Sequence, residues 1–275
     1  MKRKIGIILA LVLVSFLMVG TASAGLFDFL GGGSGSNATN DNSTFIVGFD
    51  AEFPPYGYQD DNGSYTGFDL DLAKEVCERN NWTFKAQPID WDAKDAELDS
   101  GSIDCIWNGF TIDGRENDYL WSDPYFDNKQ IFVVKSDSGI NSIADLKEKT
   151  VETQKDSSAL AALEGDNKTI ADTFKELKQV ADYNTAFMDL ESGACDAVAM
   201  DIGVAEYDID QKNGTDTYSI LNESITTEKY GVGFKKGNTD LKDTVQKTLD
   251  EMFKDGTVAK IAEKYGISQD ALIQK

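Results

Sequence analysis

The feature that most constrains the fold of this chain is a short stretch that occurs twice. Leu98-Asp-Ser-Gly101-Ser-Ile-Asp104 in the first half resembles Leu190-Glu-Ser-Gly193-Ala-Cys-Asp196 in the second half. In each copy the end of a predicted helix is followed by a glycine, an aspartate and a short apolar run typical of a strand. A unit that recurs in both halves predicts two lobes of the same design. Ligands bind at the carboxyl ends of strands in open α/β sheets, so we expect a cleft between the lobes.

Strand-like and helix-like segments alternate around this repeat. Short apolar runs predict strands, and apolar residues at helical spacing predict amphipathic helices. The predicted strands are 45–49, 83–89, 103–107, 130–135, 151–154, 197–200 and 230–234, and the predicted helices are 68–79, 143–149, 157–164, 186–192 and 239–265, the last broken near Gly256. This order predicts an α/β fold with mainly parallel sheets.

The composition excludes several classes of function. The 275 residues include 48 Asp and Glu against 26 Lys and Arg, with no His and a formal net charge of −22. So acidic a chain lacks the basic surface that binds nucleic acid. Without histidine it has neither a Ser-His-Asp triad nor His-ligated zinc. We expect Cys77, Cys105 and Cys195 to be buried thiols, with a bridge between Cys77 and Cys105 left open.

The N-terminus predicts export. A basic segment, an apolar run and the small residues ending at Ala24 have the order of a cleaved signal peptide, residues 1–24. An uncleaved membrane anchor is the alternative. Residues 25–43 are rich in Gly, Ser and Asn and predict a flexible tether, with a frayed chain terminus as the alternative. We therefore expect a periplasmic or cell-surface protein, with tethering to the membrane left open.

Charged residues near the predicted strand ends form a candidate binding site. The guanidinium of Arg115 is suited to a carboxylate, and Asp201, at the end of strand 197–200, is suited to an ammonium group. Ser157 and Ser158 begin a helix, where free N–H groups favour an anion. A surface ion pair and helix N-caps are the ordinary alternatives for these residues. Together they match the two charged ends of a zwitterion.

Two aromatic residues and one further acid complete the set of candidates. Phe53 and Trp91 each lie just past a strand, and two such rings are able to enclose an aliphatic chain. Core packing is the ordinary alternative for them. Asp50 ends the first strand, where a turn residue is the alternative.

Several motifs in one order resemble a known family. They are Asp50-Ala-Glu-Phe-Pro-Pro-Tyr-Gly-Tyr58, Gly67-Phe-Asp-Leu-Asp-Leu-Ala73, Gly101-Ser-Ile-Asp104, Asn108-Gly-Phe-Thr111, Arg115, Ser122-Asp-Pro-Tyr125, Gly231-Val-Gly-Phe-Lys-Lys-Gly237 and 255–266. Over residues 45–267 the chain resembles the extracellular solute-binding proteins, family 3, of polar amino-acid ABC importers. The resemblance implies a two-lobed, periplasmic-binding-protein-like type II fold with two hinge strands. Lobe 1 would comprise 44–135 and 231–275, and lobe 2 would comprise 136–230.

The resemblance also implies roles for the candidate residues. Arg115 would bind the ligand carboxylate and Asp201 the ammonium group, while Phe53 and Trp91 would stack on the side chain. Thr111 would touch both ends of the ligand, Asn108 and Gly109 would offer backbone groups, Ser157 and Ser158 would offer a hydroxyl and N–H groups, and Asp50 would lie near the ligand side chain. The loop from Thr111 to Arg115 is one residue shorter than usual, which implies a tight turn at Gly114. Asp156 in the second-lobe loop is expected to point away or to contact the ligand side chain.

We therefore predict a monomeric binding protein, not an enzyme, without cofactor or metal. It would close on a polar or cationic L-amino acid, or on cystine, and deliver it to an ABC permease in the membrane. A dehydratase for prephenate-like compounds, with Glu52 or Asp156 as the acid, and a sensory domain of a receptor are the alternatives. Acidic ligands are disfavoured because no second cation is evident beside the aromatic residues.

Overall fold

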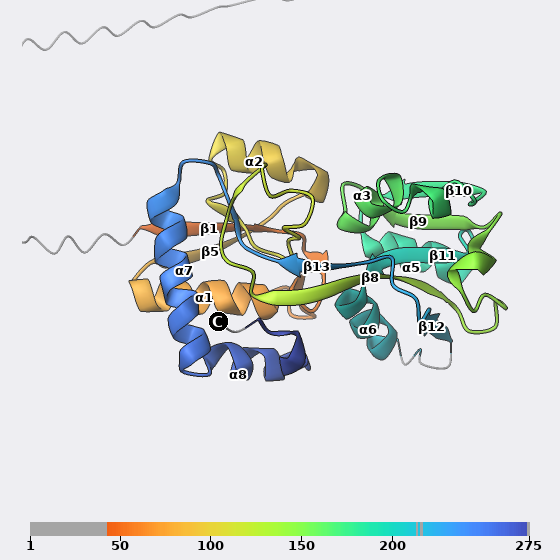
Figure 1. Ribbon diagram of the computed structural model, residues 1–275. Coiled ribbons are helices and arrows are strands. Elements are labelled where there is room, and N and C mark those ends of the chain that lie inside the picture. The colour runs from red at the N-terminus through yellow and green to blue at the C-terminus, as the bar shows by residue number, and fades with distance from the viewer. Residues whose placement is uncertain (1–42, 213, 215–216, 274–275) are drawn as a thin grey trace, which may run out of the picture. The chain divides into compact units, whose positions relative to one another are not determined.

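The computed structural model describes residues 43–212, 214 and 217–273. Strands and helices are organised around two mixed sheets and one small three-stranded sheet (Figure 1). The predicted signal peptide, 1–24, and the predicted tether up to residue 42 lie outside the described residues. Within the described residues no helix combines the length and the apolar character needed to cross a bilayer.

The first lobe is built on a five-stranded sheet of order β5-β1-β6-β14-β7. Its strands are β1 (Thr44–Phe49), β5 (Thr83–Pro88), β6 (Cys105–Ile106), β7 (Leu120–Trp121) and β14 (Gly233–Phe234). The helices are α1 (Phe68–Asn80), α2 (Lys94–Ser100), α7 (Thr239–Lys254) and α8 (Thr257–Lys264), and a 3-10 turn, η1 (Trp91–Ala93), precedes α2. In Figure 1, α1 and α2 flank β1 and β5 on opposite sides. The small sheet, β2 (Glu52–Phe53), β3 (Gly57–Gln59) and β4 (Tyr65–Thr66), follows β1.

The second lobe is built on a six-stranded sheet of order β10-β9-β11-β8-β12, with β13 also paired to β8. Its strands are β8 (Phe126–Lys135), β9 (Thr150–Gln154), β10 (Glu176–Val180), β11 (Ala197–Asp201), β12 (Tyr218–Ile220) and β13 (Thr226–Tyr230). The helices are α3 (Ser158–Glu164), α4 (Lys168–Ala171), α5 (Tyr183–Ser192) and α6 (Ile202–Gln211), and a 3-10 turn, η2 (Ile143–Leu146), precedes β9. A third 3-10 turn, η3 (Gln269–Ala271), follows α8 and packs against it. Alternation along β11 sends Val198 and Met200 into the core that includes α5 and α6, whereas Ala197 and Ala199 join the core beneath α3.

The repeated stretch forms the same structure in both lobes. Gly101 and Gly193 end α2 and α5 with left-handed φ angles of 78° and 82°, a conformation that glycine adopts without strain. The carboxylate of Asp104 accepts a hydrogen bond from the Ile46 N–H at 2.7 Å, and that of Asp196 accepts one from the Thr150 N–H at 2.8 Å. Each aspartate therefore ties its helix end to the neighbouring parallel strand. The prediction of two lobes of one design is confirmed.

Other details differ from the sequence prediction. The sheets are mixed rather than mainly parallel, because β14, β8, β12 and β13 run antiparallel to their neighbours. The predicted strand 230–234 is split in two, since β13 ends at Tyr230 and β14 begins at Gly233. The predicted helix 143–149 is the 3-10 turn η2. The break in the last helix falls at Gly256 as expected, and the three cysteines are buried and free.

Strands β8 and β13 connect the two sheets. They pair antiparallel, with Phe126 opposite Tyr230 and Gln130 opposite Thr226. All of β8 is hydrogen-bonded within the second sheet, although the sequence placed residues 126–135 with lobe 1. The residues at which one lobe ends and the other begins, when the lobes move relative to each other, stay a prediction.

Candidate functional site

Loops that follow the strands of both lobes bring the predicted residues to one pocket. Nine of the ten candidates line it: Phe53, Trp91, Asn108, Gly109, Thr111, Arg115, Ser157, Ser158 and Asp201, joined by Gln154. The cavity between them measures about 20 Å³. That volume has room for about one water molecule, so the side chains that line this pocket fill most of it.

Asp50 lies behind this pocket. Its carboxylate accepts a hydrogen bond at 2.6 Å from Nε2 of Gln154, which reaches it from the second lobe. Burial raises the pKa of Asp50 to about 6. Asp50 does not line the pocket of about 20 Å³ but lines an adjoining cavity of about 600 Å³, together with Trp91, Glu52 and Asp182. Gln154 was missed by the sequence interpretation, since nothing local shows that it spans the lobes.

Arg115 is held by a tight turn. Its N–H donates to the carbonyl of Ile112 at 2.8 Å, and Gly114 takes a left-handed φ of 80°, so the shortened loop closes as expected. The guanidinium lies 5.4 Å from the Phe110 ring. It donates to the carbonyls of Thr111 at 3.4 Å and Asp156 at 3.1 Å. The guanidinium therefore lies on the pocket wall, where it also reaches the second lobe.

Asp201 is a buried carboxylate at the end of β11. Its Oδ1 accepts hydrogen bonds from Asn128 at 2.7 Å, Gln130 at 2.8 Å and the Tyr230 hydroxyl at 2.6 Å. Asp201 stands at the N-cap position of α6, but its side chain makes no capping hydrogen bond. The capping alternative is therefore wrong. Burial, followed by the charge of Glu228, raises the pKa of Asp201 to about 7.

Glu228 is a second buried acid that the sequence interpretation missed. Its Oε1 accepts hydrogen bonds from Thr111, Asn128 and Gln130, each at 2.8 Å, and its Oε2 accepts one from the Ser158 hydroxyl. Glu228 faces inward on β13, two residues before the buried Tyr230. A charged residue at an inward position of an alternating strand was the signal available in the sequence.

The remaining candidates are partly engaged in local structure. Ser157 caps α3, because its hydroxyl oxygen accepts from the Leu160 N–H at 3.1 Å. The Gly109 N–H donates to the buried carboxylate of Asp69 at 2.6 Å, and Asn108 Oδ1 accepts from the Asp50 N–H at 2.9 Å. Phe53 packs 6.0 Å from Tyr183 of the second lobe. Trp91 makes an edge contact with Phe110 at 5.4 Å.

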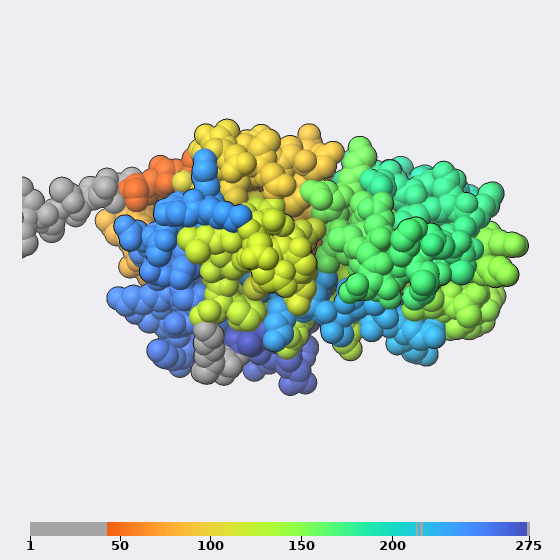
Figure 2. Space-filling model, turned by 45° about the horizontal axis from the view of Figure 1, so that its top comes forward, coloured from red at the N-terminus to blue at the C-terminus, as the bar shows by residue number. Residues whose placement is uncertain are grey.

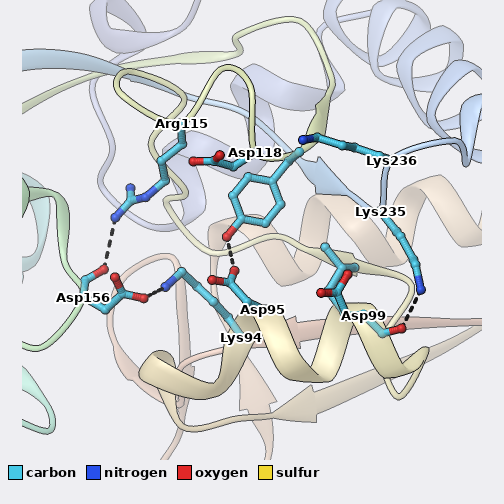
Figure 3. Close-up of a pocket in the computed structure, with 10 residues that line it drawn as sticks. Lys94, Asp95, Asp99, Arg115, Asp118, Asp156, Lys235 and Lys236 are labelled. Carbon is cyan, nitrogen blue, oxygen red and sulfur yellow. Dashed lines mark hydrogen bonds and ion pairs between the residues drawn. The ribbon is translucent and has the colours of Figure 1, made fainter.

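An ion pair joins the lobes beside this pocket. Nζ of Lys94, from α2, pairs with the carboxylate of Asp156, from the loop before α3 (Figure 3). The pair and Arg115 border an outer cavity of about 410 Å³. In Figure 2 the green surface around residues 150–165 lies against the gold surface around α2. Asp156 takes a left-handed φ of 55°, which favours glycine over an acidic residue.

Lys94 changes the expected charge balance of the pocket. Its side chain is 2% exposed, and its Nζ lies 5.1 Å from the centre of the Trp91 ring. Burial lowers the pKa of Lys94, and the Asp156 hydrogen bond opposes that shift. A second cation therefore stands beside the aromatic residues, contrary to the sequence interpretation. The absence of a second cation therefore no longer disfavours acidic ligands.

The fold and the cleft define a class: two-lobed, type II periplasmic binding proteins. The family described as "Bacterial extracellular solute-binding proteins, family 3" matches residues 45–268, and this chain belongs to that family. The L-cystine-binding protein TcyJ of Escherichia coli is 31% identical over 232 residues, which cover 83% of this chain and 85% of that protein. A probable histidine-binding protein of Neisseria gonorrhoeae is 30% identical over 247 residues, 85% of this chain and 88% of that protein.

Solved structures support the same assignment. A substrate-binding protein of an ABC uptake transporter from Streptococcus pneumoniae, with bound histidine, superimposes with a TM-score of 0.82 and 34% identity, covering 86% of this chain and 96% of that one. An ancestral arginine-binding protein bound to arginine gives a TM-score of 0.74 and 38% identity, covering 81% and 98%. These relatives are named as binding proteins.

Proposed function

We propose that this chain is an extracytoplasmic receptor that binds an L-amino acid and delivers it to an ABC permease. The observation that carries the proposal is the pairing of opposite charges on one pocket. Arg115 presents a guanidinium from the first lobe, and Asp201 presents a carboxylate from the second. Asp201 has no cationic partner within the described residues. The α-carboxylate of an amino acid would pair with the Arg115 guanidinium, and its α-ammonium group would pair with the Asp201 carboxylate.

Binding would proceed by hinge closure about β8 and β13. A cavity of about 20 Å³ is too small for an amino acid, so the lobes must separate for the ligand to enter. The ligand would meet Arg115 and the aromatic residues on the first lobe, and closure would add Asp201. Only contacts made on closure favour the closed form. The closed form would then be recognised by the permease.

The side chain of the ligand would extend past Trp91. The adjoining cavity of about 600 Å³ carries the carboxylates of Asp50, Glu52 and Asp182. These charges favour a polar or cationic side chain, as in arginine or lysine, and the volume of the cavity also has room for one half of cystine. Export, a periplasmic or cell-surface location and a monomeric state belong to the same proposal.

A thermal-shift panel tests this function. The purified protein would be unfolded, refolded to remove bound ligand, and mixed with each L-amino acid and with cystine. A ligand present at ~1,000 times its Kd adds about 4 kcal/mol to the free energy of unfolding, which is a shift of several degrees. One or a few strong shifts without turnover are expected. Absence of any shift, or turnover of a prephenate-like compound, would favour the dehydratase on this fold.

The ion pair between Lys94 and Asp156 supplies a separate prediction. Because it joins the lobes without a ligand, Lys94→Met is expected to open the ligand-free protein. Small-angle scattering would then show a larger radius of gyration for the variant. The affinity for every amino acid would fall by the same factor, about tenfold or less, because only the closing equilibrium changes.

Two further measurements separate this explanation from direct contact. Lys175→Met replaces an exposed lysine outside the pocket and serves as the control, with no expected change. Asp156→Gly, which also relieves the left-handed backbone, should open the protein as Lys94→Met does. A loss of affinity that differs strongly between ligands would instead mean that Lys94 touches the ligand.

A further inference from the structure

Glu228 contacts predicted ligand-binding residues of both lobes. It lies on the connecting strand β13, directly opposite Asn128 of β8, and is 5% exposed. The Thr111 hydroxyl donates to it from the first lobe and the Ser158 hydroxyl from the second. A residue of the hinge therefore determines how two hydroxyls of the pocket are oriented.

This arrangement determines whether the two hydroxyls donate hydrogen bonds to a ligand or accept them from it. A serine or threonine hydroxyl has one proton to donate and two lone pairs to accept with. The protons of Thr111 and Ser158 are both directed at the Glu228 carboxylate. Only lone pairs remain for the pocket, so each hydroxyl would accept from a ligand ammonium group rather than donate to a carboxylate.

The surrounding groups are also rich in acceptors. The amide nitrogens of Asn128 and Gln130 each donate to both Asp201 and Glu228, so the two acids lie side by side. The amide oxygens of the same two residues are buried and find no partner within the described part of the chain. Two carboxylates and two amide oxygens without a partner are favourable neighbours for a cation, because a cation with several N–H groups would balance their charge and donate hydrogen bonds to them.

We propose that Glu228 is the second carboxylate of the ammonium site and makes Thr111 and Ser158 hydrogen-bond acceptors, so that the pocket selects ligands with a free primary ammonium group. This inference rests on the proposed function. The carboxylate of the ligand is then left to Arg115. Ligands whose α-nitrogen is replaced by a hydroxyl are excluded because they supply one donor and no charge to this cluster of acceptors.

Glu228→Gln tests the proposal, because glutamine keeps the shape of the side chain and removes its charge. The probes are L-arginine, L-histidine and L-cystine, each compared with its α-hydroxy acid: argininic acid, imidazole-lactic acid and 3,3'-dithiobis(2-hydroxypropanoic acid). For each pair, calorimetry gives the ratio of the Kd of the hydroxy acid to the Kd of the amino acid. Glu228→Gln is expected to lower this ratio at least tenfold. Glu152→Gln, which changes a fully buried acid outside the pocket, should leave it unchanged.

The pH dependence distinguishes an electrostatic role from a structural one. The charge of Glu228 helps to raise the pKa of Asp201, which also faces Tyr230, Tyr56 and Tyr183. In Glu228→Gln the pH above which amino-acid affinity levels off should therefore move toward acid. A variant that merely packed badly would lose affinity for both members of a pair and keep the same pH profile.

Thr111→Val tests the direction of the hydrogen bonds. If the hydroxyl accepts from the ammonium group, this variant weakens amino-acid binding more than hydroxy-acid binding. Equal losses for both, or an unchanged ratio in Glu228→Gln, would overturn the inference and leave Asp201 alone as the ammonium site. If the wild-type protein binds none of the three amino acids, the proposed ligand set fails and this inference fails with it.

Discussion

Replacing Arg115 with alanine is expected to weaken binding of the preferred amino acid by about 100-fold or more. The variant leaves the ligand carboxylate inside a closed pocket without its guanidinium, and an unpaired buried charge costs several kcal/mol. The ligand-free protein should change little in stability. Within the described residues, the hydrogen bonds that the Arg115 guanidinium donates run to two backbone carbonyls, those of Thr111 and Asp156. Calorimetry of the variant and of the wild-type protein measures the difference.

Arg115→Lys is the matched comparison. Lysine keeps the positive charge but lacks the planar pair of donors that fits a carboxylate, so an intermediate loss is expected. The decarboxylated amine of the preferred ligand provides the second control, because it should bind Arg115→Ala and wild-type protein alike. If Arg115→Ala keeps full affinity, the carboxylate is held elsewhere. Lys94, the other cation beside Trp91, is then the residue to test.

The sequence predicted the parts of the site that depend on local pattern. Arg115 follows a short turn and Asp201 ends an apolar strand, and each position is visible within about ten residues. The glycine and aspartate of the repeat predicted two similar lobes for the same reason. Such features need no knowledge of which elements become neighbours.

The missed residues depend on pairings that no local pattern shows. Glu228 joins the site because β13 pairs with β8, which places it opposite Asn128. Lys94 is buried because the loop carrying Asp156 covers it from the second lobe, although its position in α2 looks like that of a surface lysine. Gln154 meets Asp50 across the same boundary. Contacts between lobes and between distant strands were thus the part that sequence alone did not predict.

The pH dependence of binding follows from the burial of Asp201. Its pKa is about 7 in the ligand-free protein, compared with 3.8 for an unperturbed aspartate. Because the folded-state pKa is raised, the protonated form stabilises the fold at low pH, and this contribution is lost as pH rises from about 4 through 7. A ligand ammonium group requires the ionised carboxylate. Affinity is therefore expected to rise with pH, by up to about tenfold per unit below pH 7, and to level off above it.

Asp201→Asn is expected to remove this dependence together with most of the affinity. The loss should be about 100-fold or more at pH 8, because the ammonium group is then buried without its closest carboxylate. Below pH 6 the affinities of the wild-type protein and the variant for the amino acid should become similar. At pH 8 the ligand-free variant should also be more stable than the wild-type protein, since it no longer ionises a buried acid at this position.

Asp208→Asn separates the two effects of Asp201→Asn. Asp208 is a buried acid of α6 outside the pocket, and burial raises its pKa to about 7 as well. Its asparagine variant should gain stability at pH 8 in the same way and should keep both the affinity and its pH dependence. Asp50 and Asp69 also titrate between about 6 and 7, but they are unchanged in every variant compared, so their contributions cancel. If Asp201→Asn binds amino acids with the wild-type pH profile, the linked proton belongs to another group, and Asp201 does not hold the ammonium group of the ligand.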